Sequence, residues 1–210
     1  MPYVSESIRK FTSDLSAKLP APGGGAAAAL VGAVSASLNC MVGNFTAGNE
    51  KYADAEAEIR ELLKKSEEVR EELLKLLEED ILAYGNYSKA SKLPKITEVE
   101  KQVRAKALEA ALLDAATVPF NIMLCCYNVL QACKPLAEKG NKNLLSDVGV
   151  AAYFAKAALK AAYLNVIVNF LYLKEEAFKC KILKETEILL KNADIIEGLI
   201  EDACYKNLKK

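Results

Sequence analysis

The hydrophobic positions of the chain recur every three or four residues, and no segment alternates with a period of two. This spacing extends over residues 5–17 and, as a long stripe of leucine and isoleucine, over residues 51–87. A period near 3.6 is typical of amphipathic helices, whereas a half-buried strand alternates apolar and polar residues. The pattern therefore predicts an all-α protein, and we expect a single bundle-like domain of six to eight helices across residues 1–210.

Residues 26–46 are apolar nearly all round and contain small residues, among them Gly32, Ala33 and Ala36, that permit close helix packing. Such a helix is either buried on all sides or spans a membrane. Polar residues such as Asn39 interrupt the run, no basic cluster flanks it, and no second segment has its character. We expect a buried central helix, surrounded by a thick domain or a partner subunit, and no membrane span.

Helix boundaries in the middle of the chain are marked by proline and by capping residues. The sequence Leu93-Pro94-Lys95 interrupts the long helix, and Thr97 with Glu100 has the pattern of a capping box that starts the next one. The long helix and its successor are therefore predicted to be separated by a short turn.

The second half of the chain is predicted to contain three more helices. We expect Pro119 to break, kink or restart the helix that follows the capping box, and a further helix to begin at Phe120 and end near Gly140. Ser146 or Asp147 is expected to cap the next, apolar helix. Residues 175–208 have the pattern of a final amphipathic helix.

The charge and the rare residue types exclude several classes of function. Lys and Arg total 28 and so do Asp and Glu, which gives a net charge of zero and argues against binding to nucleic acid. The chain has no histidine, so a metal enzyme is not expected, and acid or base catalysis must use Asp, Glu, Lys, Tyr or Cys. The six cysteines lie in apolar helical patterns without C-x-x-C spacing, which indicates reduced, buried thiols. No secretory signal is recognisable, so a cytoplasmic location is expected.

A glycine-rich stretch, Pro20-Ala21-Pro22-Gly23-Gly24-Gly25, leads directly into the small-residue helix. The N-terminus of a helix presents unpaired N–H groups, so this stretch can hold an anionic or carbonyl-bearing ligand against the backbone. A dinucleotide fingerprint would need a buried strand before the glycines, and a Walker loop would need Gly-Lys-Ser/Thr, which is absent. The alternative is a turn followed by a closely packed helix.

Polar residues within apolar helical faces are the other candidates for chemistry, because each needs a partner or a function. Asp80 lies one turn before Tyr84 on one side of the long helix, although Glu79 and Asp80 could also both belong to that helix's solvated acidic face. Asn165 and Asn169 are spaced i, i+4 in an otherwise apolar stretch. They suggest either a hydrogen-bonded contact between helices or contacts with a ligand.

A third group of polar residues surrounds two predicted turns. Asn141, Asn143 and Asp147 precede the apolar helix, where ordinary turn and capping chemistry is the alternative to ligand binding. Lys51 follows a Gly-Asn pair at the start of the long helix, where a lysine is usually solvated.

Four separated pieces of the chain, in order and with compatible spacing, resemble the cyclodeaminase domain of formiminotransferase-cyclodeaminase, which also occurs as a free-standing protein in a methenyltetrahydrofolate cyclohydrolase subgroup. The pieces are Pro20–Gly25 with its alanine helix, Lys51-Tyr52, Glu79-Asp80-x-x-x-Tyr84 with Leu93-Pro94-Lys95, and Gly140-Asn141 through Ser146–Ala151 to Asn165-Val166-x-x-Asn169.

The resemblance implies an all-helical, homodimeric folate enzyme that uses a tetrahydrofolate derivative as substrate and no cofactor. The implied activity is formimidoyltetrahydrofolate cyclodeamination, which yields 5,10-methenyltetrahydrofolate and ammonia. Methenyltetrahydrofolate cyclohydrolase is the alternative, and a helical scaffold or a folate-binding protein without catalysis is a further one. Asp80 matches the family's acidic residue and would be the catalytic acid and base. The basic stretch from Lys89 to Lys106 would meet a polyglutamate tail.

The residues that the resemblance assigns to substrate binding are Pro22, Gly23, Gly24, Gly25, Lys51, Tyr84, Asn141, Asn143, Asp147, Asn165 and Asn169.

Overall fold

The computed structural model describes residues 2–208, and this part of the chain folds into helices and turns without a strand. Six α-helices are present, which confirms the prediction of an all-α protein with six to eight helices. Their bounds are α1 Ile8–Ser16, α2 Gly24–Thr46, α3 Glu56–Ser91, α4 Glu98–Lys139, α5 Leu145–Phe170 and α6 Glu176–Leu208. Three short 3₁₀ helices, Tyr3–Ser5, Glu50–Ala55 and Lys142–Leu144, precede α1, α3 and α5 respectively.

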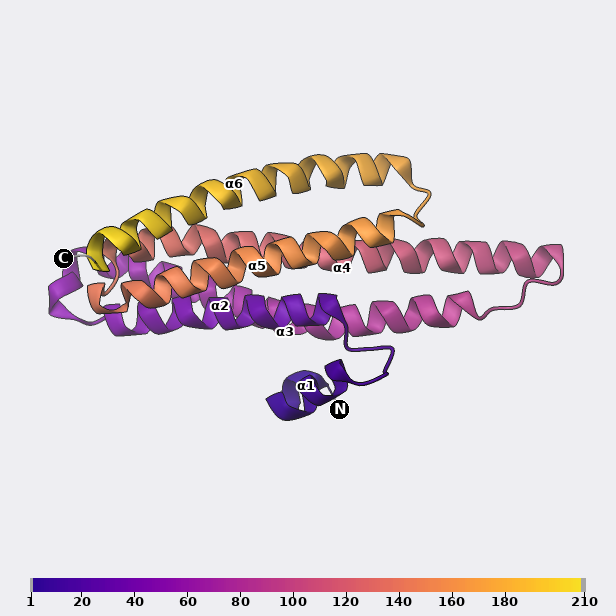
Figure 1. The fold of residues 1–210 in the computed structure, drawn as a ribbon, viewed down its shortest axis with the longest axis horizontal. Helices are drawn as coiled ribbons and strands as arrows, with labels where there is room; N and C mark the ends of the chain where they lie inside the picture. Colours follow the sequence, from indigo (N-terminus) through magenta and orange to yellow (C-terminus); the bar gives the residue numbers. More distant parts are fainter. Residues whose placement is uncertain (1, 209–210) are drawn as a thin grey trace.

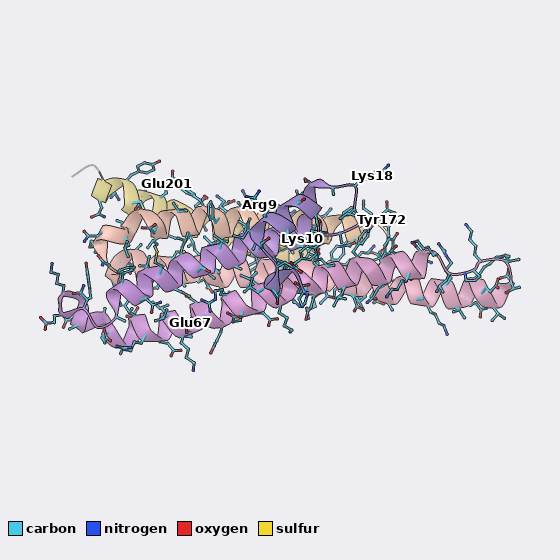
Figure 2. The ribbon with its side chains drawn as sticks, turned by 90° about the horizontal axis from the view of Figure 1, so that it is seen from below. Arg9, Lys10, Lys18, Glu67, Tyr172 and Glu201 are labelled. Carbon is cyan, nitrogen blue, oxygen red and sulfur yellow. The ribbon has the colours of Figure 1, made fainter. Side chains whose placement is uncertain are left out.

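Helices α2 to α5 form a four-helix bundle in which α2 packs against α3 and α5, and α4 packs against the same two helices (Figure 1). Helix α6 lies along α4 and α5. Helix α1 lies outside the bundle, with Arg9 and Lys10 on its surface (Figure 2), and is held by the buried ring of Phe11. The core is therefore shared by the four central helices and closed on one side by α6.

Helices α3 and α4 are longer than α2 and α5 and project together beyond them as a helical hairpin (Figure 1). The 42 residues of α4 correspond to about 63 Å of helix, compared with about 35 Å for the 23 residues of α2. The surface beside the hairpin therefore forms a step at the level where α2 begins and α5 ends, because α3 and α4 continue beyond this level.

Helix α4 does not break at Pro119, so the prediction of a separate helix beginning at Phe120 is wrong. A proline inside a helix lacks the N–H that would bond the carbonyl of the residue four positions earlier, here Ala115. Asn169 of α5 supplies the missing donor, since its Nδ2 lies 2.6 Å from the Ala115 carbonyl oxygen. A contact between two helices thus replaces the hydrogen bond that the proline removes.

The capping box before α4 is confirmed: the Thr97 hydroxyl accepts from the N–H of Glu100, whose carboxylate accepts from the N–H of Thr97. The predicted cap of α5 is wrong, because neither Ser146 nor Asp147 precedes the helix. The 3₁₀ turn Lys142–Leu144 leads into α5 directly, and Asn141 caps this turn by accepting from the N–H of Asn143.

Helix α2 is less enclosed than its sequence predicts. Its inner faces are buried against α3, α4 and α5, but Val34 is 43% exposed and Phe45 is 62% exposed. The expectation that no second segment resembles a membrane span is also wrong. By length and composition alone, α2, α4 and the segment Lys142–Phe170 are each apolar enough to cross one. In α2, 61% of the most apolar stretch is buried inside the protein.

All six cysteines are free thiols and four of them are buried, but the prediction of burial fails for Cys180, which is exposed on α6, and Cys125 is only half-buried. Helix α6 is attached to α5 by ion pairs as well as by apolar packing. The ammonium group of Lys156 lies 3.0 Å from Asp194 and also contacts the carboxylate of Glu197. These pairs hold α6 against the side of α5 that carries Lys156.

Candidate active site

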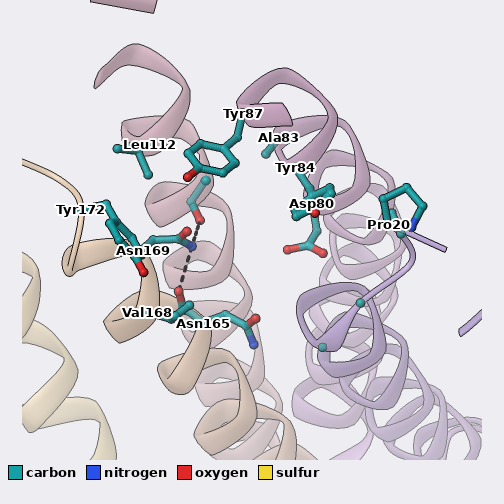
Figure 3. Close-up of a pocket in the computed structure, with 14 residues that line it drawn as sticks. Pro20, Asp80, Ala83, Tyr84, Tyr87, Leu112, Asn165, Val168, Asn169 and Tyr172 are labelled. Carbon is teal, nitrogen blue, oxygen red and sulfur yellow. Dashed lines mark hydrogen bonds between the residues drawn. The ribbon is translucent and has the colours of Figure 1, made fainter. Parts of the chain in front are cut away.

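A cavity of about 350 Å³ lies at the step where α2 begins and α5 ends (Figure 3). Its walls come from the glycine-rich loop, the C-terminal part of α3, the middle of α4 and the C-terminal end of α5. The lining residues are Pro20, Ala21, Gly23, Gly24, Asp80, Ala83, Tyr84, Tyr87, Leu112, Ala115, Asn165, Val168, Asn169 and Tyr172. Asp80 is the only residue with a charged side chain among these lining residues.

The carboxylate of Asp80 rests on the N-terminus of α2. Its Oδ2 accepts a hydrogen bond of 2.9 Å from the backbone N–H of Ala26. This approach requires a glycine at position 25, because a Cβ there would lie 2.0 Å from Oδ1 of Asp80. The third glycine of the loop therefore makes room for the carboxylate, while the helix N-terminus orients it.

Burial raises the pKa of Asp80 above its ordinary value, and the hydrogen bond from Ala26 opposes this shift without cancelling it. The surroundings supply few groups that stabilise the charge, because the cavity walls are mainly apolar and aromatic and contain no Lys or Arg. An acid that holds its proton more tightly than usual is suited to donate it and to take it back.

The neighbouring carboxylate, Glu79, points to the outer surface, where it pairs with Lys75 at 3.3 Å. The acidic pair is therefore divided, with Glu79 on the solvated face and Asp80 in the cavity. Glu79 therefore belongs to the solvated acidic face of α3, whereas Asp80 is the polar residue that is available for chemistry.

Asn165 and Asn169 line the opposite wall, on α5 (Figure 3). Asn165 donates to the carbonyl of Ala161 in its own helix, at 2.9 Å. Asn169 donates to Ala115 of α4 and to the carbonyl of Asn165, at 2.6 and 2.8 Å. Within residues 2–208 no protein group donates to the amide oxygen of either side chain. Asn169 thus joins two helices, and both residues offer acceptor oxygens at the cavity.

Three tyrosines complete the cavity: Tyr84 and Tyr87 on α3, and Tyr172 just beyond the end of α5 (Figure 3). Tyr84 and Tyr172 are exposed at the mouth, with Tyr172 63% accessible. The apolar surfaces of Leu112 and Ala83 lie between them. A slot lined by aromatic rings and short apolar side chains suits a flat heteroaromatic ligand.

The predicted site residues divide into two groups. Gly23, Gly24, Asp80, Tyr84, Asn165 and Asn169 line the cavity, and Gly25 lies directly beneath Asp80. Pro22 is buried behind the loop and does not line the cavity. Lys51, Asn141, Asn143 and Asp147 lie at the other end of α2, a helix length of about 35 Å away.

At that other end, Asn141 links its own turn, Lys142–Leu144, to the end of α2 and to the 3₁₀ helix Glu50–Ala55. Its backbone N–H donates to Thr46 Oγ1 at 2.9 Å, and its Nδ2 donates to the carbonyl of Phe45 at 3.2 Å. Its Oδ1 accepts from the N–H of Asn143 and from the hydroxyl of Tyr52, at 3.1 and 3.3 Å. The turn and capping interpretation therefore accounts for Asn141 within a single chain.

Several lining residues were not predicted from the sequence. Tyr172 follows Asn169 by three positions and Val168 by four, so the helical spacing that picked out Asn169 could have included it. Leu112 and Ala115 of α4 gave no such signal, because nothing in their spacing shows that α4 passes behind the cavity. Metal binding gains no support in residues 2–208, where no three side chains of His, Cys, Asp or Glu gather. The expectation of no metal stays a prediction.

Comparison with known proteins gives matches over most of the chain. The sequence model described as formiminotransferase-cyclodeaminase matches residues 7–188. The methenyltetrahydrofolate cyclohydrolase of Methylorubrum extorquens is 40% identical over 205 residues, which cover 98% of this chain and 97% of that protein. The formimidoyltransferase-cyclodeaminase of Mus musculus is 33% identical over 194 residues, which cover 92% of this chain but 36% of that protein. The chain thus spans about a third of this longer relative.

A solved structure is also similar over nearly its whole length. The crystal structure of formiminotetrahydrofolate cyclodeaminase from Thermotoga maritima matches this fold with a TM-score of 0.82 and 30% sequence identity. The match covers 98% of this chain and 97% of that chain. The helical architecture and the sequence motifs therefore lead to the same group of proteins.

Proposed function

Because the chain belongs to the formiminotransferase-cyclodeaminase family, we propose that it is an enzyme of folate one-carbon metabolism and that its reaction takes place in the Asp80 cavity. The observation that carries this assignment is a single carboxyl group of raised pKa, held by a helix N-terminus in a slot lined by tyrosines. Two of the relatives are named for reactions of the methenyl and formimino derivatives of tetrahydrofolate. In both candidate reactions below, the attacking group must lose a proton and the leaving nitrogen must gain one.

The first candidate reaction is cyclodeamination of 5-formimidoyltetrahydrofolate. N10 attacks the formimidoyl carbon, and the tetrahedral adduct then loses its exocyclic nitrogen as ammonia to leave the methenyl bridge. Asp80 as a carboxylate accepts the proton released from N10, and as a carboxylic acid returns a proton to the departing nitrogen. The raised pKa makes the protonated form of Asp80 more accessible than that of an ordinary aspartic acid.

The second candidate is hydrolysis of 5,10-methenyltetrahydrofolate, and the 40% identity to a cyclohydrolase of the same length favours it. Water attacks the bridging carbon and gives up a proton to Asp80. The proton then passes to N5 as the bond between N5 and that carbon breaks, and the hydroxyl on the carbon releases its remaining proton to solvent as it becomes the carbonyl of the formyl group on N10. One carboxyl group serves both reactions, because each begins with loss of a proton by the attacking group and ends with protonation of the leaving nitrogen.

The cavity offers contacts for the flat part of a folate. The rings of Tyr84, Tyr87 and Tyr172 would stack on or border the pterin, and the amide oxygens of Asn165 and Asn169 would accept from its N–H groups. Gly23 and Gly24 would allow the ligand to approach the backbone. Substrate specificity would then rest on shape and hydrogen bonding, with Asp80 reserved for the proton.

The glutamate tail of the folate would extend toward the α3–α4 hairpin. Part of its positive charge is already engaged, since Arg104 bonds the carbonyl of Ser91 and Lys101 pairs with Glu98. Lys89, Lys92, Lys95 and Lys106 make no ion pair within residues 2–208, so they can attract a polyanionic tail. Affinity for a polyglutamylated folate should accordingly fall as salt is added.

We also place this enzyme in the cytoplasm, as a soluble homodimer without a nucleic-acid or membrane partner. The zero net charge and the similarity to a crystallised cyclodeaminase support this proposal. The exposed apolar side chains of α2 provide a surface that a second subunit would cover.

Two assays on the purified protein test the assignment. Formation of methenyltetrahydrofolate from the formimidoyl compound, followed by its absorbance, reports cyclodeamination, and loss of that absorbance from added methenyltetrahydrofolate reports hydrolysis. We expect catalysis of one reaction to exceed the other by at least tenfold, and this difference identifies the enzyme. Binding of 5-formyltetrahydrofolate with neither activity would reduce the protein to a folate carrier, and no binding at all would leave only a helical scaffold.

A further inference from the structure

Two prolines lie inside helix α4, and each leaves one backbone carbonyl of the helix without its usual donor. Pro119 frees the carbonyl of Ala115, which lines the Asp80 cavity. Pro135 frees the carbonyl of Gln131, which lies outside this cavity. Pro119 itself is buried and does not line the cavity. Any effect of Pro119 on a ligand must therefore pass through the groups that its missing N–H leaves free.

The side chain of Asn169 takes the freed carbonyl of Ala115 (Figure 3). The Nδ2 atom of Asn169 lies 2.6 Å from the Ala115 oxygen and 2.8 Å from the backbone oxygen of Asn165. A side-chain amide nitrogen carries two N–H groups, so these two carbonyls use both of them. The opposite orientation would turn the amide oxygen toward two carbonyl oxygens, and acceptors facing acceptors form no hydrogen bond. The two carbonyls therefore fix the orientation of the amide.

A fixed amide limits what Asn169 can offer to a ligand. Both of its N–H groups are used by the protein, so only its Oδ1 is left for the ligand, and that atom is an acceptor. Asn165 differs, because its Nδ2 has one bond, to the carbonyl of Ala161 in its own helix, and keeps a second N–H. Of the two asparagines at the cavity, Asn169 is thus restricted to accepting, whereas Asn165 can donate or accept.

Any other residue at position 119 would remove this restriction, because it would bring a backbone N–H. In the ordinary helical pattern that N–H bonds the carbonyl four residues earlier, which is the carbonyl of Ala115. It would compete with Asn169 for this acceptor and release one N–H of the side-chain amide. With only the bond to Asn165 to orient it, the amide could rotate and present an N–H to the ligand in place of Oδ1.

We infer that Pro119 is a positioning residue of the cavity: it keeps the Ala115 carbonyl free for Asn169, and thereby selects ligands that place an N–H against the Asn169 amide oxygen. This role rests on the proposed function, in which the ligand is a folate, since the pterin ring carries N–H donors of this kind. Asp80 is held independently, by the N–H of Ala26 in α2. Pro119 therefore governs ligand binding and leaves the proton transfer to Asp80.

Pro119→Ala tests this role, and Pro135→Ala is the matched control in the same helix. Each substitution restores one backbone N–H to α4, but only the first does so beside the cavity. Fluorescence titration with 5-formyltetrahydrofolate should show a dissociation constant about tenfold higher in Pro119→Ala, and within about twofold of wild type in Pro135→Ala. The KM of the preferred substrate should rise by a similar factor, while kcat stays within about twofold. Unchanged affinity in Pro119→Ala would overturn the role.

Urea unfolding separates positioning of the ligand from support of the fold. Proline is less favourable than alanine inside a helix, and the N–H restored at position 119 completes the hydrogen bonding of α4. Pro119→Ala should therefore unfold at a urea concentration equal to or above that of the wild-type protein. Weaker binding in a protein of undiminished stability does not come from a loosened fold. A loss of both affinity and stability would show that Pro119 supports the fold alone, and would overturn the role.

Replacement of Pro119 by lactic acid separates the missing N–H from the proline ring. The resulting backbone ester, introduced by nonsense suppression, has neither the ring nor an N–H at this position, so Asn169 should keep the Ala115 carbonyl. We expect the ester variant to bind 5-formyltetrahydrofolate within about threefold of wild type, and thus more tightly than Pro119→Ala. An ester variant that binds as weakly as Pro119→Ala would show that the ring matters and not the free carbonyl.

The amide of Asn169 can also be followed without a ligand. Selective ¹⁵N labelling of asparagine reports its side-chain N–H groups by NMR, and an Asn169→Ala sample identifies their signals. Both protons are hydrogen-bonded in the wild-type protein and should exchange slowly with solvent, whereas exchange in Pro119→Ala should be at least about tenfold faster. Equal exchange in the two proteins would overturn the fixed amide. Because this measurement needs no folate, its outcome is distinct from a failure of the proposed function, in which the wild-type protein does not bind folate.

Discussion

The two ends of α2 use their polar groups in opposite ways. At its N-terminal end, the carboxylate of Asp80 has one hydrogen bond, from Ala26, and the amide oxygens of Asn165 and Asn169 receive none from residues 2–208. At its C-terminal end, both polar atoms of the Asn141 side chain are bonded to neighbouring segments. One end keeps polar atoms available to a ligand, and the other uses them to hold loops together.

This difference shows why residues that the sequence assigns together to substrate binding need not all have the same role. A buried polar atom that already has its partner gains little from a ligand, whereas an unpaired one at a cavity is stabilised by binding. The cavity end should therefore respond to mutation mainly in activity, and the far end mainly in stability. The predictions below test this division.

Among the substitutions that test this division, the largest effect is expected for Gly25→Ala. The new Cβ would lie 2.0 Å from Oδ1 of Asp80, so the carboxylate must leave its position on the helix N-terminus. We expect activity to fall by about 10²-fold or more, as when a catalytic group is misplaced by about 1 Å. Steady-state kinetics and circular dichroism measure this. Gly198→Ala on α6, where a Cβ meets no atom within 4 Å, is the control and should keep full activity.

The next prediction compares how mutations at the two ends of α2 change the free energy of unfolding. Asn141→Ala leaves the carbonyl of Phe45 without this donor and the hydroxyl of Tyr52 without its acceptor, and we expect it to lower the free energy of unfolding by about 1–3 kcal/mol. Asn165→Ala removes only a bond to its own helix, and should cost less than about 1 kcal/mol while weakening folate binding. Urea unfolding and a folate titration compare the two. Equal losses of stability would contradict the division.

A smaller effect is expected from the contact between Asn169 and the α4 proline. Asn169→Ala removes the donor to the Ala115 carbonyl and should cost about 1 kcal/mol. In a Pro119→Ala background the backbone N–H at position 119 can bond that carbonyl, so the same substitution should cost less. A double-mutant cycle should give a coupling energy of about 1 kcal/mol. Strict additivity would show that Asn169 does not replace the bond that Pro119 removes.

The smallest effect concerns the stability of the protein with Asp80 ionised. Burial raises the pKa of Asp80 in the folded state, so the folded protein holds this proton more tightly than the unfolded chain. This tighter binding of the proton adds to the free energy of unfolding. Its contribution is fully present below the ordinary pKa of 3.8 and is lost as pH rises through the raised pKa. Asp80→Asn cannot ionise, so its stability relative to wild type should increase from acidic to neutral pH. Unfolding curves at both pH values measure this, and a decrease would contradict burial as the dominant cause.

The sequence predicted the fold well because the signals for its helices are local. Apolar periodicity located the helices, and Thr97 with Glu100 marked the start of α4 correctly. Pro119 was misjudged because the group that compensates for it, Asn169, comes from another helix some 50 residues later in the chain. A single-sequence argument about proline cannot include a partner whose position depends on the fold.

The candidate site was predicted in part for a similar reason. Asp80, Tyr84, Asn165 and Asn169 each stand out within one helix, and the structure brings them to one cavity. Spacing along the chain does not show that α2 carries Lys51 a whole helix length away from Asp80. Only the fold shows that these residues lie at opposite ends of α2.

The central claim is that Asp80 transfers the proton in a folate reaction at this cavity, and Asp80→Asn tests it most directly. The amide keeps the shape of the side chain and can still accept from Ala26, but it cannot exchange a proton. We expect 5-formyltetrahydrofolate to bind with an affinity close to that of the wild-type protein, and turnover of the preferred substrate to fall by about 10²- to 10⁴-fold. An Asp80→Asn enzyme that retains wild-type turnover would contradict the account.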